Sequence, residues 1–386
     1  MKKQLIIFIS VVCTLVLYTN YKAQQIFPSA TLITGLGTAL LFVLMLGWQF
    51  LYRSNSDIFN KLWFHGLAWT GSVLMGLWGI FILLSIPVDI IGFLISQLLQ
   101  ASQAATTIEQ TQSISHNIDL SIFSISIGIT VLGFLQVLRG PKVKQVSAAI
   151  PGLHPSLEGL KIAQISDLHV GPTIRKKYVE QVVSLTNALR PDLIVLTGDL
   201  ADAKVSSIIE DLQPLGNLRS NYGNYYVTGN HEYYWGAGEL IEQMKTLRFV
   251  PLINENRIVC KDEAKILVAG VTDPAGKHFL TGHYPDLAKA ARSSEKTQLK
   301  ILLAHRPDVC FEAEKMGFDL QFSGHTHSGQ FFPFSLLIPL FHKYYRGLHL
   351  HSKTWLYVNP GTGYWGPANR FAVNAEITLL SLGKAH

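Results

Sequence analysis

Potential metal ligands follow a series of apolar segments between Lys161 and His327. They occur in the motifs SDLH, TGDL, TGNHE, LAH and GHTH, in that order. Carboxylate and amide oxygens mixed with imidazole nitrogens suit a pair of divalent ions better than a tetrahedral thiolate site. The candidate ligands are Asp167, His169, Asp199, Asn230, His305, His325 and His327, and His231 directly follows Asn230. A single such His is usually a surface or core residue, but the ordered set predicts a metal-dependent hydrolase.

The motif order resembles the calcineurin-like metallophosphoesterase family, whose marks are DxH, GD, GNH, a lone His and GHxH. The resemblance covers roughly Leu160 to Leu382 and implies a four-layer α/β/β/α sandwich. GHTHSGQ, the apolar Pro-containing stretch after it and the terminal AEITLLSL segment are most similar to the bacterial membrane-associated branch, which includes phosphodiesterases and lipid-A-pathway pyrophosphatases. One departure is VNPGTG at Val358–Gly363, where the family pattern leads us to expect an Arg-containing segment.

The resemblance also implies a division of labour among the ligands. One ion would be held by Asp167, His169 and His327, the other by Asn230, His305 and His325, and Asp199 would bridge them. A bridging carboxylate can offset the repulsion between cations that lie roughly 3.5–4 Å apart. His231 would not bind metal but would protonate the leaving group, because imidazole has a suitable pKa range. The choice among Mn, Fe, Zn and Mg stays open.

The N-terminal part of the chain is expected to be a membrane region. Ala30–Tyr52, Leu62–Val88 and Leu120–Leu138 contain no Asp, Glu, Lys or Arg. Each is near the roughly 20 residues that a helix needs to cross a bilayer. Leu5–Asn20 follows Lys2 and Lys3, a pattern shared with signal peptides, but no small-residue cleavage site follows it, so we favour a retained anchor. An all-α transmembrane region of about four helices is therefore predicted over residues 1–140.

Basic residues near the apolar runs predict the orientation in the membrane. Lys2 and Lys3, Arg53 and Lys61, and Arg139, Lys142 and Lys144 would all lie on the cytoplasmic side. The catalytic domain would then face the cytoplasm, with a bacterial inner membrane as the expected location. Ile90–Leu99 is too short to cross alone and is predicted to be an interfacial segment. If it crosses together with its flanks, the domain would lie outside.

The remaining chain is predicted to hold a basic linker over residues 141–157 and a catalytic domain over residues 158–386. Apolar segments alternate with helical patterns there, which indicates layered α/β construction. Ile174–Leu189 is predicted to be a helix. The predicted strands are Leu160–Ile165, Leu193–Thr197, Tyr225–Thr228, Ile266–Val271, Ile301–Ala304 and Leu320–Phe322. The candidate ligands lie just beyond the carboxyl ends of strands, where open α/β sheets place their sites.

The sequence favours a membrane-anchored phosphoesterase with two divalent ions, which cleaves a phosphodiester or pyrophosphate bond. The expected partners are the lipid bilayer and a phosphorylated small molecule or lipid. The alternatives are a broad phosphodiesterase acting on soluble nucleotides and a membrane sensor that binds a phosphorylated ligand without turnover. A transporter is disfavoured because the apolar runs contain no charged residue. No nucleic-acid partner is expected: the net charge is +6, but no basic helix with interleaved aromatic residues is present.

Three further features leave alternatives open. Phe331–Tyr345 is either an apolar lip that accepts acyl chains or part of the core. Tyr233, Tyr234 and Trp235 are either a substrate wall or ordinary packing. Asp273 either orients a ligand His or caps a turn. The substrate-binding residues and the oligomeric state are not predicted.

Overall fold

The structure is a computed structural model that describes residues 2–54, 58–101 and 108–384. The chain divides into two compact units. The helical unit comprises Met1–Phe134 with Gly366–Asn369, and the catalytic unit comprises Leu135–Trp365 with Arg370–His386. Each unit is described below by itself.

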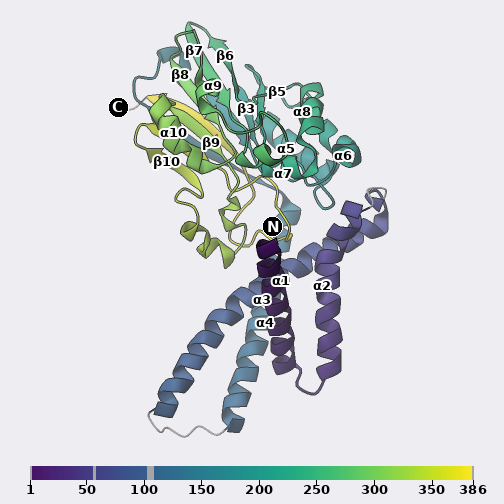
Figure 1. Ribbon diagram of the computed structural model, residues 1–386. Coiled ribbons are helices and arrows are strands. Elements are labelled where there is room, and N and C mark those ends of the chain that lie inside the picture. The colour runs from purple at the N-terminus through teal and green to yellow at the C-terminus, as the bar shows by residue number, and fades with distance from the viewer. Residues whose placement is uncertain (1, 55–57, 102–107, 385–386) are drawn as a thin grey trace. The chain divides into compact units, whose positions relative to one another are not determined.

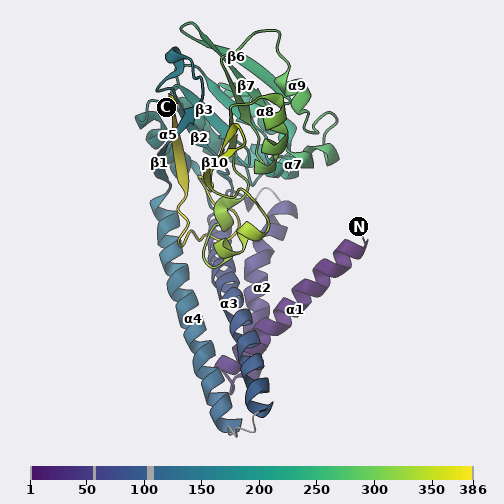
Figure 2. The same cartoon turned by 90° about the vertical axis from the view of Figure 1, so that its left-hand side faces the viewer.

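The helical unit is built from long apolar helices, coloured purple to blue in Figures 1 and 2. They are α1 (Lys2–Ile26), α2 (Thr31–Ser54), α3 (Leu62–Ala101) and α4 (Ile108–Arg139). Within the described residues, 3 segments are long and apolar enough to cross a membrane: Thr31–Arg53, Leu62–Leu99 and Ser113–Arg139. The expected fourth span is helical but is not among them. Polar residues in the second half of α1, such as Asn20 and Gln24, reduce its mean hydropathy.

Ile90–Leu99 differs from the prediction of a separate interfacial segment. It continues α3 without a break, and α3 runs for 40 residues with Pro87 inside it. At 1.5 Å per residue, a helix of this length extends about 60 Å, twice the roughly 30 Å of a hydrocarbon core. The hydropathy pattern did not predict one continuous helix, because Pro87 and Asp89 interrupt the apolar run, although the backbone stays helical there.

Charged side chains meet inside the helical unit, just beyond the charge-free apolar runs. Lys22 Nζ of α1 lies 2.7 Å from Asp89 Oδ1 of α3 and 2.5 Å from Asp119 Oδ1 of α4. The Tyr18 hydroxyl donates to Asp89 Oδ2 at 2.6 Å. Lys22 and Asp119 are both buried. These contacts link three helices through one ammonium group, which satisfies buried charges that are costly when they are unpaired.

Replacing Lys22 by Met should destabilise the helical unit by about 3–5 kcal/mol, the usual cost of removing one partner of a buried ion pair. Asp119 would keep its charge in a buried position without a cation beside it. Thermal unfolding of the detergent-solubilised chain, followed by far-UV circular dichroism, measures the change. Lys22→Arg keeps the positive charge and serves as the matched control. An unchanged transition in Lys22→Met would show that the pairs do not stabilise the unit.

The catalytic unit is a sandwich of two sheets, each with 6 strands. The first has the order β1-β12-β2-β3-β4-β5 and the second β10-β11-β9-β8-β7-β6. Strands of the first sheet are β1 (Lys142–Ile150), β2 (Lys161–Ile165), β3 (Leu193–Thr197), β4 (Asn224–Val227), β5 (Phe249–Pro251) and β12 (Glu376–Lys384). Those of the second are β6 (Glu255–Lys261), β7 (Ala264–Gly270), β8 (Leu299–Leu303), β9 (Leu320–Ser323), β10 (Gly347–His351) and β11 (Thr354–Val358).

Apolar side chains from both sheets form the central core, including Ile162, Val195, Ile301 and Phe322. Helices cover the outer faces. The first sheet is flanked by α5 (Lys176–Ala188), α6 (Val205–Leu212) and α8 (Ala237–Thr246), and the second by α9 (Leu287–Ala291) and α10 (Cys310–Ala313). A second cluster joins α9 to the second sheet through Leu287, Leu267 and Leu302. The expected α/β/β/α sandwich is confirmed, and the predicted central strands and the helix after β2 are all present.

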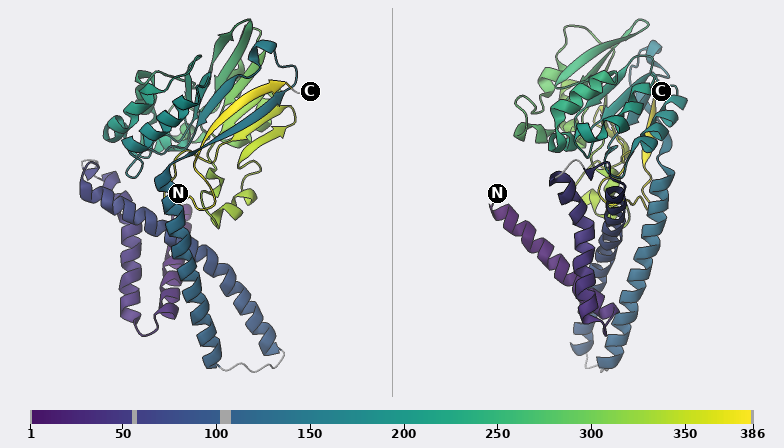
Figure 3. Two further views of the ribbon diagram at one scale, coloured as in Figure 1. Left: turned by 180° about the vertical axis from the view of Figure 1, so that it is seen from behind. Right: turned by 90° about the vertical axis from the view of Figure 1, so that its right-hand side faces the viewer.

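The predicted linker over residues 141–157 contains a strand instead. Lys142–Ile150 forms β1, which pairs in parallel with β12 from Lys142 opposite Glu376 to Ile150 opposite Lys384. Figure 3 shows the dark blue β1 beside the yellow β12. Much of β1 is exposed because it is an edge strand, so its sequence lacks the apolar run of a central strand. The fold therefore begins before the segment that carries the motifs.

Candidate metal centre

All of the predicted ligands lie after the carboxyl ends of strands. Asp167 and His169 follow β2, Asp199 follows β3, His305 follows β8, and Asn230 begins the short helix α7 (Asn230–Trp235) after β4. Backbone φ angles are positive at Asp167 (50°), His169 (53°), Asp199 (50°), His325 (70°) and His327 (48°). Residues other than Gly rarely adopt a backbone conformation with positive φ. Backbone strain of this kind is concentrated at functional sites. The strand ends thus place these side chains at the cost of local backbone strain.

Two glycines allow the ligand loops to approach each other. A Cβ atom on Gly229 would overlap Asp199 Oδ1, and one on Gly324 would overlap Asp167 Oδ2. Both glycines directly precede ligand residues, so their lack of a side chain is required by packing.

The first ligand group consists of Asp167, His169 and His327, which are all buried. His327 Nε2 lies 3.3 Å from Asp167 Oδ1 and 3.0 Å from His169 Nε2. These are the residues that the family resemblance assigned to one ion.

The second ligand group consists of Asp199, His305 and His325. His305 Nε2 lies 3.3 Å from Asp199 Oδ2 and 3.2 Å from His325 Nδ1. Asn230 Oδ1 is buried and has no hydrogen-bond partner. Buried amide oxygens are nearly always bonded, so this atom is suited to a cation.

Asp199 lies between the groups. Its Oδ2 is 4.0 Å from His169 Nε2 in the first group and 3.3 Å from His305 Nε2 in the second. The carboxylate can therefore serve both groups at once.

The donor set fits bound cations. Imidazole nitrogens face each other in each group, and at most one proton can lie between two such atoms. Burial lowers the pKa of His325 to about 3 and that of His327 to about 4, so both rings are neutral and offer lone pairs. Burial opposes a charge on His305 as well, yet Asp199 raises the pKa of His305 to about 10. The carboxylates thus favour positive charge at this position.

Asp202 contacts two residues of the candidate site, although the motifs did not predict it. One carboxylate oxygen hydrogen-bonds His231 Nδ1, and the other lies 3.2 Å from His169 Nδ1. This contact holds the His231 ring with Nε2 toward Asp199 Oδ2, at 3.9 Å. Burial works to lower the pKa of His231, but Asp202 and then Asp199 raise it to about 9. The contact with Asp202 therefore favours the protonated form of the ring. The available signal was the second acidic residue in GDLAD.

Glu232 was also missed and is fully buried. Its carboxylate accepts hydrogen bonds from the backbone N–H groups of Asp199 (3.0 Å), Leu200 (2.5 Å) and Gly229 (2.5 Å). It therefore joins the loop after β3 to the loop after β4. Its position next to His231 in TGNHE gave no indication of this role.

Arg370 lies outside VNPGTG in the sequence but contacts that loop from a buried position. Its buried guanidinium donates to the Pro360 carbonyl at 2.7 Å and, through Nε, to the Gly363 carbonyl at 3.0 Å. Arg370 Nη2 also lies 3.3 Å from His327 Nδ1. Arg370 thus holds the VNPGTG loop and contacts the candidate ligand His327, and its charge is buried rather than exposed to solvent.

The surroundings of the site show where the aromatic residues and Asp273 lie. Tyr233 is buried and its hydroxyl hydrogen-bonds Thr228 and His283. The exposed rings of Tyr234 and Trp365 flank His231, with ring centroids 5.4 and 5.6 Å away. Asp273 caps a turn at Ala275 and pairs with Arg306 at 2.7 Å, so it does not orient a ligand His.

The fold and the candidate site are those of a metal-dependent phosphoesterase. Comparison with known proteins supports the same class. Residues 160–329 match the model of the calcineurin-like phosphoesterase family. The chain is 36% identical over 297 residues to a Bos taurus transmembrane protein with metallophosphoesterase domain, covering 74% of this chain and 67% of that one. A Helicobacter pylori metallophosphoesterase is 36% identical over 273 residues, which are 70% of this chain and 72% of the relative.

Solved structures give weaker matches. A 5'-nucleotidase precursor from Thermus thermophilus has 16% identity and a TM-score of 0.38, over 57% of this chain and 54% of that one. The chain belongs to the calcineurin-like phosphoesterase family, and it is accordingly a phosphoric ester hydrolase.

Proposed function

We propose that the catalytic unit hydrolyses a phosphodiester or pyrophosphate bond with two divalent ions, one in each ligand group. The position of Asp199 carries the proposal, because its Oδ2 lies within 4.0 Å of an imidazole nitrogen from both groups. Asp167, His169 and His327 would hold one ion. Asn230, His305 and His325 would hold the other, and Asp199 would contact both.

The ions, when bound, supply polarisation of the phosphoryl oxygens and a water of lowered pKa. The chain supplies the proton for the leaving group. His231 is held by Asp202 and is not fully buried, so it can reach a substrate oxygen. Its contact with Asp202 favours the protonated ring, which can supply the proton that a leaving alkoxide or phosphate requires.

A lipid-linked substrate is favoured by the exposed surface of Phe331–Tyr345. Phe331 and Ile338 are buried, but Leu336, Leu340 and Phe341 are 66%, 77% and 72% exposed. Apolar side chains gathered on the surface commonly mark a ligand or membrane contact. A soluble nucleotide remains the second candidate, because the exposed Tyr234 and Trp365 rings beside His231 could stack on a base.

A panel of substrates and metals tests the proposed function. The purified full chain is assayed with Mn, Fe, Zn or Mg against bis-p-nitrophenyl phosphate, p-nitrophenyl phosphate, a soluble nucleotide diester and a lipid pyrophosphate. We expect metal-dependent turnover of the diester or the pyrophosphate. Binding of these compounds without any turnover would instead support a sensor.

Replacing Leu336, Leu340 and Phe341 together by Ser should weaken hydrolysis of an acylated substrate and spare a small soluble diester. Each side chain could contribute roughly 1.5–3 kcal/mol when it is buried against an acyl chain. The ratio of kcat/KM values for the two substrates measures the effect. Equal losses on both substrates, accompanied by a lower melting temperature, would show that the stretch only stabilises the fold.

We also propose that the catalytic unit faces the cytoplasm, at a bacterial inner membrane. Arg53 lies in the last turn of α2, Lys61 precedes α3, and Arg139 ends α4, so these basic residues flank the same ends of the spans. Reporters fused after His386 test the orientation. A cytoplasm-dependent fluorescent reporter should be bright, and an alkaline phosphatase that needs export should be inactive. The reverse pattern would contradict the orientation.

A further inference from the structure

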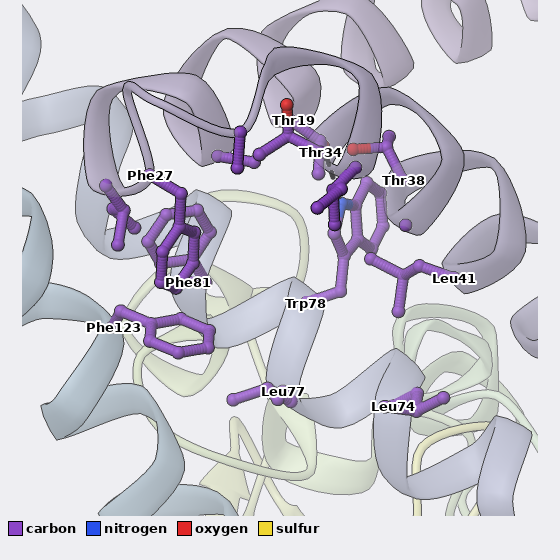
Figure 4. A pocket seen from close by; sticks show the side chains of 15 residues that line it. Thr19, Phe27, Thr34, Thr38, Leu41, Leu74, Leu77, Trp78, Phe81 and Phe123 are labelled. Atoms are coloured by element: carbon purple, nitrogen blue, oxygen red, sulfur yellow. Dashed lines mark hydrogen bonds between the residues drawn. The ribbon is translucent and has the colours of Figure 1, made fainter.

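We infer that the helical unit holds one acyl chain of a membrane lipid in a lateral cavity among α1, α2, α3 and α4. The cavity has a volume of about 390 Å³. Figure 4 shows its lining, with Phe81, Phe123 and Leu77 on one side and the threonines of α1 and α2 on the other. Small-molecule sites typically have volumes of about 300–1,000 Å³, so this space is large enough for a ligand.

The residues that line the cavity follow α2 and α3, a path that an extended acyl chain can occupy. Residues at helical spacing line it, including Thr34, Thr38 and Leu41 of α2 and Leu74, Trp78 and Phe81 of α3. The lining from Ile33 to Leu41 extends about 12 Å along α2 at 1.5 Å per residue.

The lining offers an occupant almost no free polar group. The Thr19 hydroxyl donates to the Leu15 carbonyl at 2.7 Å and accepts from Trp78 Nε1 at 2.9 Å. The Thr34 hydroxyl donates to the Thr31 carbonyl at 2.9 Å. Apolar cavities of this kind stay dry, so water is not a suitable occupant.

The opening of the cavity lies at the surface of a membrane-spanning helix. Phe27 and Ile33 on its rim are 52% and 72% exposed, and Ile33 belongs to the candidate span Thr31–Arg53. The surrounding medium at such a helix is hydrocarbon, so lipid chains have direct access. Lys22, near Ala23 in the lining, is already paired with Asp89 and Asp119, so it does not select a head group. The acyl chain is therefore the part of the lipid that this site recognises.

Gly37 provides a direct test. It lines the cavity, and a Cβ atom built on it meets nothing within 4 Å, so a larger side chain can enter the space. Gly35 has the same open surroundings but does not line the cavity. Two residues along a helix differ by about 200°, so Gly35 lies on the opposite face of α2. Gly37→Phe and Gly35→Phe are a matched pair.

The full chain is reconstituted, without detergent, in phosphatidylcholine vesicles that contain a phospholipid with a photoreactive diazirine in its acyl chain. After irradiation, mass spectrometry locates the lipid adducts. We expect adducts at Leu77, Phe81 or Phe123 in the native chain and in Gly35→Phe, and their loss in Gly37→Phe. Circular dichroism checks that both variants keep their helices.

Two results would overturn the inference. One is the absence of lipid adducts at these lining residues in the native chain, with adducts only on exposed positions such as Leu36 and Leu40. The other is an equal yield of lining adducts in folded Gly37→Phe and in the native chain. If Gly37→Phe does not fold, Ala23→Leu reduces the same space from α1 and is judged by the same criteria.

Discussion

Replacing Asp199 by Asn should remove the second ion and lower turnover by more than about 10²-fold. Mutating a residue that only hydrogen-bonds a metal ligand already lowers activity by up to about 10²-fold, and the loss of a ligand should be larger. The carboxylate is near-isosteric with the amide, but the change removes the negative charge between the two ligand groups. Asp199 Oδ2 lies 3.3 Å from His305 Nε2 and 4.0 Å from His169 Nε2, so both groups would lose their shared anion. Elemental analysis and steady-state kinetics on the purified chain measure the two effects.

Asp262→Asn is the matched control, because it is the same substitution at an exposed position, in the connection between β6 and β7. Its metal content and kcat should equal those of the native chain. Full metal content with near-native turnover in Asp199→Asn would show that Asp199 does not bridge the groups.

Replacing His231 by Ala should lower turnover by about 10²–10⁴, the usual range for a positioned general acid, while both ions are retained. His231 has its Nδ1 bonded to Asp202 and belongs to neither ligand set proposed above. The loss should be larger for a poor leaving group such as an alkoxide than for p-nitrophenolate, which departs without a proton. His349→Ala, a substitution on β10, is the control and should have no effect.

Asp202→Asn extends this test to a positioning residue. It should reproduce part of the loss, and it should steepen the dependence of rate on leaving-group pKa in the same direction as His231→Ala. Equal losses for good and poor leaving groups in His231→Ala, or loss of metal in that variant, would argue against an acid role.

The grouping of the candidate ligands could be predicted from the sequence because each of them lies within a few residues of the end of an apolar strand. Asp167 after β2 and Asp199 after β3 are examples, since parallel strands bring their carboxyl ends to one edge. The central strands were visible for the same reason. Buried on both faces, they are nearly continuous apolar runs.

The residues that support the ligands could not be predicted in this way. Asp202, Glu232 and Arg370 act through contacts that the tertiary fold creates. Glu232 bonds backbone groups of a loop 33 residues away, and Arg370 reaches His327 across 43 residues. No local pattern distinguishes such residues from surface charges. The edge strand β1 was missed because its exposed side chains lack an apolar run.

The helical unit shows the same limit. Apolar runs located α2, α3 and α4, but the sequence did not reveal that Asp89 and Asp119, just beyond those runs, would meet Lys22. The pairing depends on how the helices pack, and the hydropathy of each segment contains no information about its neighbours.

The number of ions required for turnover tests the central claim most directly. The metal-depleted full chain is titrated with Mn, and both bound metal and hydrolysis of bis-p-nitrophenyl phosphate are measured at each addition. The proposed two-ion mechanism predicts that turnover depends on the second equivalent, because the two ions would share Asp199 and would both contribute to the reaction. Full activity at one bound equivalent, with no gain from a second, would contradict a two-ion phosphoesterase.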